Sequence, residues 1–180
     1  MGSLLIVSGP PGAGKSSVAA ELAALDSRSA LVEGDRFFGF LAKGAIDPWH
    51  PESHEQNMVV TDAAAAATGR FAAEYTTVYD GVVGPWFLPA FGRATGLHEL
   101  DYAVLLPPEE ECVRRVKTRR GHGFTDEAAA RSMWAQFNNA AVEQRHLFES
   151  GDSTINDIVG SIRGAQSDGR LRYLVHGPDD

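Results

Sequence analysis

One stretch near the start of the chain, LLIVSGPPGAGKSSVAAELAAL, constrains the fold more than any other. Its first apolar residues predict a buried β-strand over 3–8, and the periodic apolar positions Val18, Leu22 and Leu25 predict a helix that begins at Lys15. The loop between them fits the phosphate-loop pattern G-x-x-x-x-G-K-[ST]. The residues expected to bind a nucleotide are Gly9, Pro10, Pro11, Gly12, Ala13, Gly14, Lys15, Ser16 and Ser17.

The residue types in this loop suit the binding of phosphate groups. Glycine lets backbone N–H groups approach phosphate oxygens, and the helix that follows adds the positive end of its dipole. We expect Lys15 to reach the β and γ phosphates of ATP and Ser16 to bind Mg²⁺. The alternative is a tight strand-to-helix turn without a ligand, but the position of the loop between a strand and a helix favours the nucleotide.

Short β-like runs alternate with helical patterns along the rest of the chain, which is typical of a parallel α/β sheet. The expected strands are 3–8, 29–33, 75–80, 100–106 and 171–175, and the expected later helices are 61–74, 108–120, 125–148 and 153–165. The sequence therefore predicts a three-layer α/β P-loop NTPase fold with a parallel, five-stranded, adenylate-kinase-like sheet. Residues 1–180 are expected to form a single domain.

Acidic residues follow two of the predicted strands, at the sheet edge where ligands of such folds bind. A kinase needs a carboxylate that orients the acceptor hydroxyl and takes its proton. Asp35 is the candidate for this base, with Glu33 as its substitute, and its alternative role is the N-cap of a helix from Arg36. Asp80 is expected either to bind the metal or the substrate, or to bond to the turn at Gly81.

An arginine-rich segment near 115–126 is the predicted lid. Arg115 and Arg119 are four residues apart and share one helical face, and Arg120 and His122 follow among glycines. Arginines in this place could stabilise the charge of a phosphoryl group in transfer. The alternative is a solvated helix end whose bases match the helix dipole. Gln136, in the helix that follows, is interpreted as a surface residue.

Three stretches, GPPGAGKS, VEGDRF and RRGHGFTDEAAARSMWAQF, resemble the gluconate-kinase-like small kinases. Chloramphenicol phosphotransferase, the zeta-toxin kinases, shikimate kinase and the adenylate-kinase-like enzymes are wider relatives of that group. The resemblance implies ATP with Mg²⁺ and transfer of the γ-phosphoryl group to a hydroxyl of a small molecule, such as a sugar, a sugar acid or an antibiotic. It places Asp35 at the acceptor and Arg115, Arg119 and Arg120 in the lid. By analogy of fold, the turn at 151–153 is expected near the adenine.

Two segments near 36–60 and 81–96 are expected to bind the acceptor, because both follow strands and both are rich in aromatic residues. The expected acceptor-binding residues are Asp35, Phe38, Trp49, His54, Asp80 and Trp86. The aromatics either stack on the acceptor or belong to the core. His50 and His54 are four apart, which leaves a metal site, a substrate contact or a structural role open, and Ser53 with Gln56 fits a capping box.

Composition limits the classes of partner. The net charge of −8 disfavours general nucleic-acid binding, because phosphate backbones need a basic surface. Cys112 is the only cysteine, and no apolar run approaches the ~20 residues of a membrane span. We expect a cytoplasmic monomer or homodimer. Two classes stay open, an ATP-dependent kinase with a small-molecule hydroxyl acceptor and a regulatory NTPase without one, and Asp35 beside a phosphate loop favours the kinase.

Overall fold

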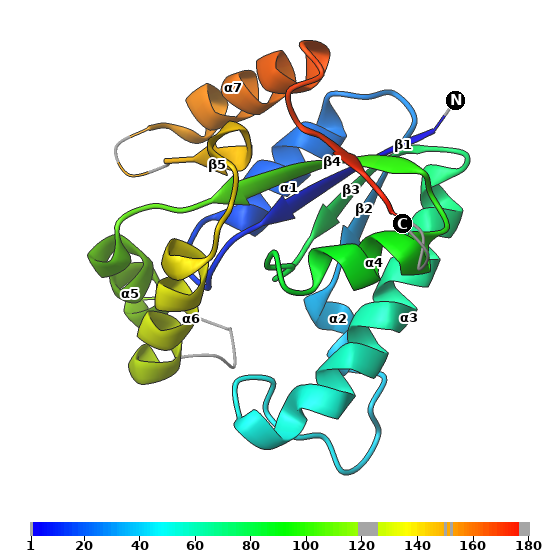
Figure 1. The fold of residues 1–180 in the computed structure, drawn as a ribbon. Coiled ribbons are helices and arrows are strands. Elements are labelled where there is room, and N and C mark those ends of the chain that lie inside the picture. Colours follow the sequence, from blue (N-terminus) through cyan, green and yellow to red (C-terminus); the bar gives the residue numbers. More distant parts are fainter. Residues whose placement is uncertain (1, 119–125, 150, 152, 177–180) are drawn as a thin grey trace.

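A parallel sheet with β1 (Ser3–Ser8) at its centre forms the frame of the molecule (Figure 1). A computed structural model describes residues 2–118, 126–149, 151 and 153–176. β3 (Thr76–Asp80) and β4 (Glu99–Leu105) pair with β1 on either side, and β2 (Ser29–Glu33) and β5 (Leu147–Phe148) lie outside them. The order β2-β3-β1-β4-β5 is wholly parallel, which confirms the predicted fold class.

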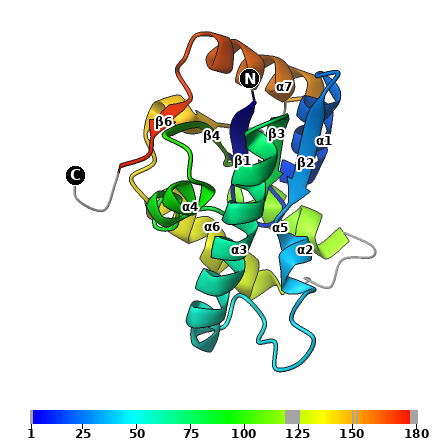
Figure 2. The same cartoon turned by 90° about the vertical axis from the view of Figure 1, so that its right-hand side faces the viewer.

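Helices cover both faces of this sheet and bury an apolar core on each (Figures 1 and 2). α1 (Lys15–Ala24) and α7 (Ile155–Ser167) pack together on one face, over a cluster that includes Val7, Leu22 and Ile162. α3 (His54–Ala72) and α4 (Leu88–Thr95) pack on the other, over a cluster that includes Ile6 and Phe91. Strands that are buried on both faces explain the continuous apolar runs in the sequence.

Several other elements lie along the edge at which the parallel strands end. They are α2 (Asp35–Phe38), the short 3-10 turn η1 (Pro51–Ser53), α5 (Glu109–Thr118) and α6 (Glu127–Asn139). A further 3-10 turn, η2 (Gln144–His146), lies away from this edge, beside the middle of β4, where His146 Nδ1 and the Tyr102 carbonyl oxygen are 2.8 Å apart. Asp126 caps α6 by accepting from the backbone N–H of Ala129. Arg131 of α6 binds Glu109 and Glu110 of α5, so these two helices form one packed pair.

The C-terminal part of the sheet differs from the prediction. The run 171–175 is not a parallel strand: β6 (Arg172–Leu174) pairs antiparallel with the N-terminal end of β4. The fifth parallel strand is β5, which lies inside the helix predicted over 125–148, because α6 already ends at Asn139 and Ala140 is extended. A strand of two half-buried residues is too short to show an alternating pattern, so the sequence gives no signal for it.

The register of the sheet brings the predicted functional residues to one place. Asp80 of β3 lies opposite Val7 of β1 on one side and Glu33 of β2 on the other. The loop after β1, the start of α2 and the end of β3 therefore meet at the same edge. The backbone N–H of Gly34 donates to the Asp80 carbonyl at 2.8 Å, which joins the ends of β2 and β3.

Candidate active site

The loop after β1 has the backbone conformation that its glycines permit. Gly9, Gly12 and Gly14 have φ values of 139°, 82° and 94°, in the region that side chains disfavour. A Cβ on Gly12 would lie 2.3 Å from the Cys112 carbonyl oxygen. The loop is therefore held tightly against the N-terminal part of α5, and a substitution at Gly12 would displace it.

The N-terminus of α1 has the features of an anion-binding site. Gly14 is its N-cap, with no capping side chain, and the first turn contains no acidic residue. The first amide groups of a helix have no partner within the helix, and its dipole attracts negative charge. Lys15 Nζ donates to the Pro10 carbonyl at 3.0 Å, so the ammonium group lies across the loop. This arrangement fits the phosphate groups of a nucleotide.

A buried carboxylate lies next to this helix start. Asp80 is 8% exposed, and burial raises the pKa of its carboxyl, while a hydrogen bond from Ser16 and the charge of Lys15 oppose the rise. The Asp80 side chain accepts from Ser16, and the N–H of Gly81 in the turn donates to the Val7 carbonyl. A hydroxyl and a carboxylate beside a phosphate loop are the oxygen ligands that Mg²⁺ takes in such sites. Ser16 and Asp80 therefore fit the predicted metal.

Asp35 is the second carboxylate of this edge, and its surroundings differ. It is the first residue of α2, whose N-cap is Gly34, so the expectation that Asp35 caps a helix from Arg36 is wrong. It is exposed and lines a cavity together with Lys15. Burial and the charges of Asp35 and Asp80 raise the pKa of Tyr79, so this phenol stays protonated.

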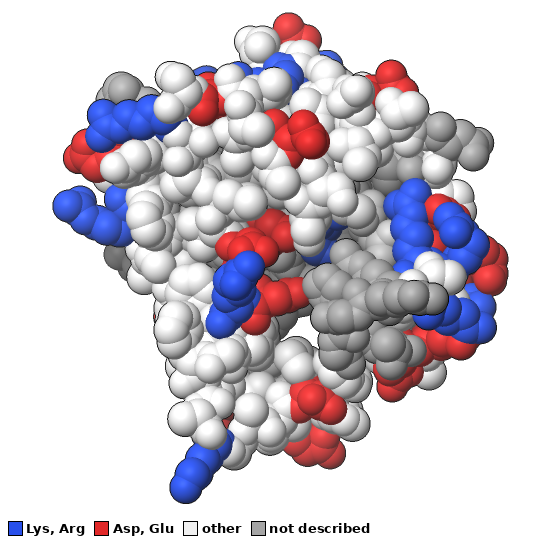
Figure 3. Space-filling model, turned by 180° about the vertical axis from the view of Figure 1, so that it is seen from behind, with Lys and Arg blue, Asp and Glu red and all other residues white. Residues whose placement is uncertain are grey.

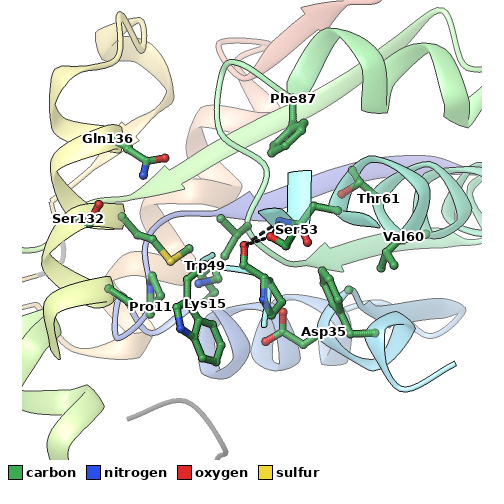
Figure 4. Close-up of a pocket in the computed structure, with 18 of the residues that line it drawn as sticks. Pro11, Lys15, Asp35, Trp49, Ser53, Val60, Thr61, Phe87, Ser132 and Gln136 are labelled. Carbon is green, nitrogen blue, oxygen red and sulfur yellow. Dashed lines mark hydrogen bonds between the residues drawn. The ribbon is translucent and has the colours of Figure 1, made fainter. Parts of the chain in front are cut away.

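The cavity has a volume of about 720 Å³ and joins the phosphate loop to both segments that were expected to bind the acceptor. In Figure 4, α6 forms one wall, α3 the opposite wall, and Phe87 lies across from Asp35 and Lys15. Its lining falls into four groups: Pro11, Gly12, Gly14, Lys15 and Ser16 of the loop; Gly34, Asp35, Phe38, Pro48, Trp49, His50, Pro51, Ser53, His54, Asn57, Val60, Thr61 and Ala64; Tyr79, Val82, Trp86 and Phe87; and Ala129, Ser132, Met133 and Gln136.

Hydrogen bonds hold in place both segments that were expected to bind the acceptor. The hydroxyls of Ser8 and Tyr102 donate to the Val83 carbonyl at 2.8 and 2.7 Å, which fixes the segment after β3 to the centre of the sheet. Ser53 does not form the predicted capping box. Its hydroxyl donates to the carbonyls of Pro48 and His50, and the Gln56 side chain bonds to the backbone of Ile46 instead.

A second cavity of about 440 Å³ lies on the other side of the phosphate loop. It is lined by Gly12, Ala13, Gly14, Ser17, Val18, Arg115, Thr118, Ser153, Ile155 and Ile158. Arg115 is bound to Glu111, and its Nη1 donates to the Gly12 carbonyl at 3.3 Å. The loop thus separates a larger cavity that contains Asp35 from a smaller one with apolar residues of α1 and α7. Ser153 lines the smaller one, in the turn that was expected near the adenine.

The structure brings most of the predicted site residues together. Phe38, Trp49, His54 and Trp86 line the larger cavity with Asp35 and Lys15, whereas Asp80 lies behind them at the loop. Arg115 lies at the smaller cavity. Arg119, Arg120 and His122 lie outside the described residues.

Sequence reasoning missed the contribution of α6. Ser132, Met133 and Gln136 line the larger cavity. Gln136 is exposed, as interpreted, but it lies on the side of α6 that faces this cavity. These residues are three and four positions apart and share one helical face, which is the signal that could have indicated a common role. Asn57 and Thr61 of α3, also four apart, were missed in the same way.

Within the described ranges, no group of three or more His, Cys, Asp and Glu side chains is placed to hold a metal ion. His54 instead stacks on Phe87, with ring centroids 6.4 Å apart and an angle of 23° between the planes. The described helices include none that is long and apolar enough to cross a membrane.

No protein-family model matches the chain, and no curated protein matches its sequence. Solved structures do share its fold. The tunicamycin resistance protein of Deinococcus radiodurans has a TM-score of 0.68 and 15% identity, over 98% of this chain and 100% of that one. A sugar kinase from Janibacter sp. HTCC2649 has a TM-score of 0.70 and 15% identity, over 93% of this chain and 95% of that one. A gluconokinase from Sinorhizobium meliloti 1021 has a TM-score of 0.64 and 17% identity, over 93% of both chains. At these identities the likeness establishes the fold, and the chain has the fold of P-loop small-molecule kinases.

Proposed function

We propose that the protein is an ATP-dependent kinase that transfers the γ-phosphoryl group of ATP to a hydroxyl of a small molecule. The observation that carries this proposal is the shared cavity, in which Asp35 and Lys15 line the same space beside the phosphate loop. A regulatory NTPase needs the loop but has no use for an acceptor cavity of about 720 Å³ that opens onto it. The names of the structural neighbours, among them a sugar kinase and a gluconokinase, support the same class.

The two carboxylates suit different tasks in this reaction. Asp35 is exposed in the cavity, where it would accept the proton of the acceptor hydroxyl as that oxygen attacks the γ-phosphorus. The bond from the γ-phosphorus to the bridging oxygen then breaks, and its electron pair leaves with ADP. Lys15 and the amide groups of the loop would hold the phosphates throughout the transfer. Ser16 and Asp80 would hold Mg²⁺, which when bound neutralises the charge of the phosphate oxygens.

The proposed base is tested by Asp35→Asn, with Lys15→Ala as a comparison. Asparagine keeps the shape of the side chain but cannot take a proton, so phosphoryl transfer should fall by roughly 10²-fold or more while nucleotide affinity changes little. Lys15→Ala should lower both turnover and nucleotide affinity, because it removes a charge that the phosphates need. Turnover is measured with a panel of sugars, sugar acids, nucleosides and antibiotics, and the fold is checked by circular dichroism.

The two variants separate the possible failures. If Asp35→Asn keeps full transfer, the base is another residue. If wild-type protein binds ATP but phosphorylates no member of the panel and hydrolyses ATP equally well in the Asp35→Asn variant, the regulatory NTPase is the better assignment.

A further inference from the structure

We propose that the acceptor is an uncharged or cationic alcohol with a flat apolar face, and not a carboxylate such as a sugar acid. The inference rests on the proposed function and specifies the substrate class of the same cavity. Three features of the described lining carry it: its charge, its aromatic surface and one unpaired hydrogen-bond acceptor.

The charge of the lining gives an anion little to bind. Apart from the imidazoles of His50 and His54, the ionisable acidic and basic side chains of its described residues include one cation, Lys15, and the carboxylate of Asp35, and the nucleotide phosphates need Lys15. The described lining includes no arginine, the side chain best suited to pair with a carboxylate through two parallel hydrogen bonds. Arg36, directly after Asp35, is bound to Glu33, and its side chain is 76% exposed. A carboxylate in this cavity would therefore lie near the Asp35 carboxylate and the ATP phosphates, which like-charge repulsion disfavours.

The aromatic surface suits a flat ligand. Trp49, Trp86, Phe38 and Phe87 come from two separate segments of the chain and line the same space. Trp86 is 43% exposed, although it packs against Phe87 and Phe137, so part of its ring remains available. Aromatic faces bind apolar rings and the apolar faces of sugars through dispersion and burial of surface.

Asn57 supplies the third feature. Its Nδ2 donates to the Pro48 carbonyl at 2.7 Å and to Ser53 Oγ at 2.9 Å, so the orientation of the amide is fixed. Its Oδ1 is buried and receives no hydrogen bond from the described residues. A buried acceptor without a donor costs about 1–3 kcal/mol. Asn57 lines the cavity, so a small local shift that uncovers Oδ1 would let a hydroxyl or amine of the ligand donate to it and remove that cost. A carboxylate has no proton to donate.

The experiment uses sets of three compounds on one aryl glycoside skeleton: the neutral sugar, its amino sugar and its uronic acid. Binding to the wild-type protein is measured by tryptophan fluorescence in the presence of Mg²⁺ and a non-hydrolysable ATP analogue, and transfer is measured with ATP. The neutral and amino members should bind at least about tenfold more tightly than the uronic acid, and aryl glycosides more tightly than methyl glycosides. The proposal would be overturned if the uronic acid bound tightly, if the aryl group did not increase the affinity, or if no set of compounds bound.

A second arm tests Asn57 without relying on a variant alone. Deoxy analogues of the tightest ligand should include one whose affinity for the wild type falls about fivefold, the loss of one hydrogen bond. Asn57→Ala should lower the affinity of the parent compound by a similar factor and leave that analogue unaffected. An equal loss for both compounds would show that Asn57 only supports the segment at Pro48. Binding in the expected order without phosphoryl transfer would keep the substrate class and reject the kinase.

Discussion

At the scale of single residues, the environment of each carboxylate decides what it can do. Asp80 is buried beside Ser16 and Lys15, while Asp35 is exposed in the cavity, two residues beyond the end of the neighbouring strand. A buried carboxylate with a hydroxyl partner is suited to a metal, and an exposed one beside the acceptor is suited to proton transfer. The sequence alone offered Asp35 as the base and left Asp80 open between a metal ligand, a substrate ligand and a bond to the turn.

Asp80 should make stability depend on pH in a defined direction. Because burial raises the pKa of Asp80 in the folded state, the folded chain binds this proton more tightly than the unfolded chain. Its contribution to the free energy of unfolding therefore falls as the pH rises from the ordinary aspartate pKa through the raised one. Asp80→Asn should melt at a higher temperature than the wild type at about pH 7.5 without ligands, and this gain should shrink towards about pH 3.

Thermal melts across this pH range, without Mg²⁺ and nucleotide, check the prediction. Asp62→Asn, on the exposed surface of α3, is the matched control and should shift the melting temperature little at any pH. A gain for Asp80→Asn that did not depend on pH would contradict the assignment of the effect to the charge.

Arg115 has a matched neighbour that separates catalysis from surface charge. Both Arg114 and Arg115 bind Glu111, but the Arg114 side chain is 63% exposed and the Arg115 side chain contacts the phosphate loop. Arg115→Ala should lower kcat by about 10²-fold and affect ATP affinity less, because a cation at this place acts mainly on charge that develops in the transition state. Arg114→Ala should change kcat less than about twofold. Steady-state kinetics and nucleotide titration measure both, and equal effects would reduce Arg115 to a link between α5 and the loop.

At the scale of the elements, the close approach of two helices explains a glycine in the middle of α3. A Cβ on Gly69 would lie 1.9 Å from the Thr95 carbonyl oxygen of α4, whereas a Cβ on Gly160 of α7 would meet nothing within 4 Å. An added methyl group therefore has no room at Gly69 but has room at Gly160, although both glycines lie within helices.

This contrast predicts opposite effects of the same substitution. Gly69→Ala should lower the free energy of unfolding by about 2 kcal/mol or more, because α4 must move to admit the methyl group. Gly160→Ala should raise it by about 0.5–1 kcal/mol, the difference in helix propensity. Urea denaturation of the two variants and the wild type measures both values. A stabilised Gly69→Ala variant would show that the contact between α3 and α4 is looser than described.

The strands also show how much of the fold could be predicted from the sequence. β1 and β2 have the predicted bounds, β3 differs by one residue at its start, and β4 differs by one residue at each end. The agreement is close because these strands are apolar runs bounded by turns. β5 was missed because two residues carry no period, and β6 was given the wrong direction because apolar content does not indicate parallel or antiparallel pairing. The phosphate loop and Asp35 could be identified from local patterns. Helical spacing groups Gln136 with Ser132 and Asn57 with Thr61, but only the packing of α6 and α3 around one cavity brings the two pairs together.

At the scale of the whole molecule, charge is distributed in pairs over the helices at the rim of the site. On α5 and α6, at the right of Figure 3, arginine and lysine side chains lie beside acidic ones, including Lys117 with Glu127 at 2.7 Å and Arg131 with Glu109 at 2.8 Å. The basic groups of this surface are thus largely neutralised by their neighbours. Inside the site, the backbone N–H groups at the start of α1 attract phosphate, and the first turn of this helix contains no acidic residue.

Binding of MgATP should therefore stabilise the whole fold. A ligand at about 100 times its Kd adds about 2.7 kcal/mol to the free energy of unfolding, which corresponds to a rise in Tm of about 5–10 °C for a chain of this size. Omission of Mg²⁺ with EDTA should remove most of this rise, because Ser16 and Asp80 then have no cation to bind. Differential scanning fluorimetry with and without Mg²⁺ measures it. Lys15→Ala is the control and should show less than half of the shift, and an undiminished shift in that variant would contradict the assignment of the loop.

The phosphate loop lies between two cavities, and this position has a stereochemical consequence. If ATP binds across the loop and the acceptor binds in the larger cavity, the attacking acceptor oxygen and the leaving oxygen of ADP lie on opposite sides of the γ-phosphorus. The phosphoryl group would then pass from donor to acceptor in a single displacement, without a phosphorylated enzyme intermediate, and both substrates would have to be bound at once. Each turnover of the proposed reaction would accordingly invert the configuration at phosphorus.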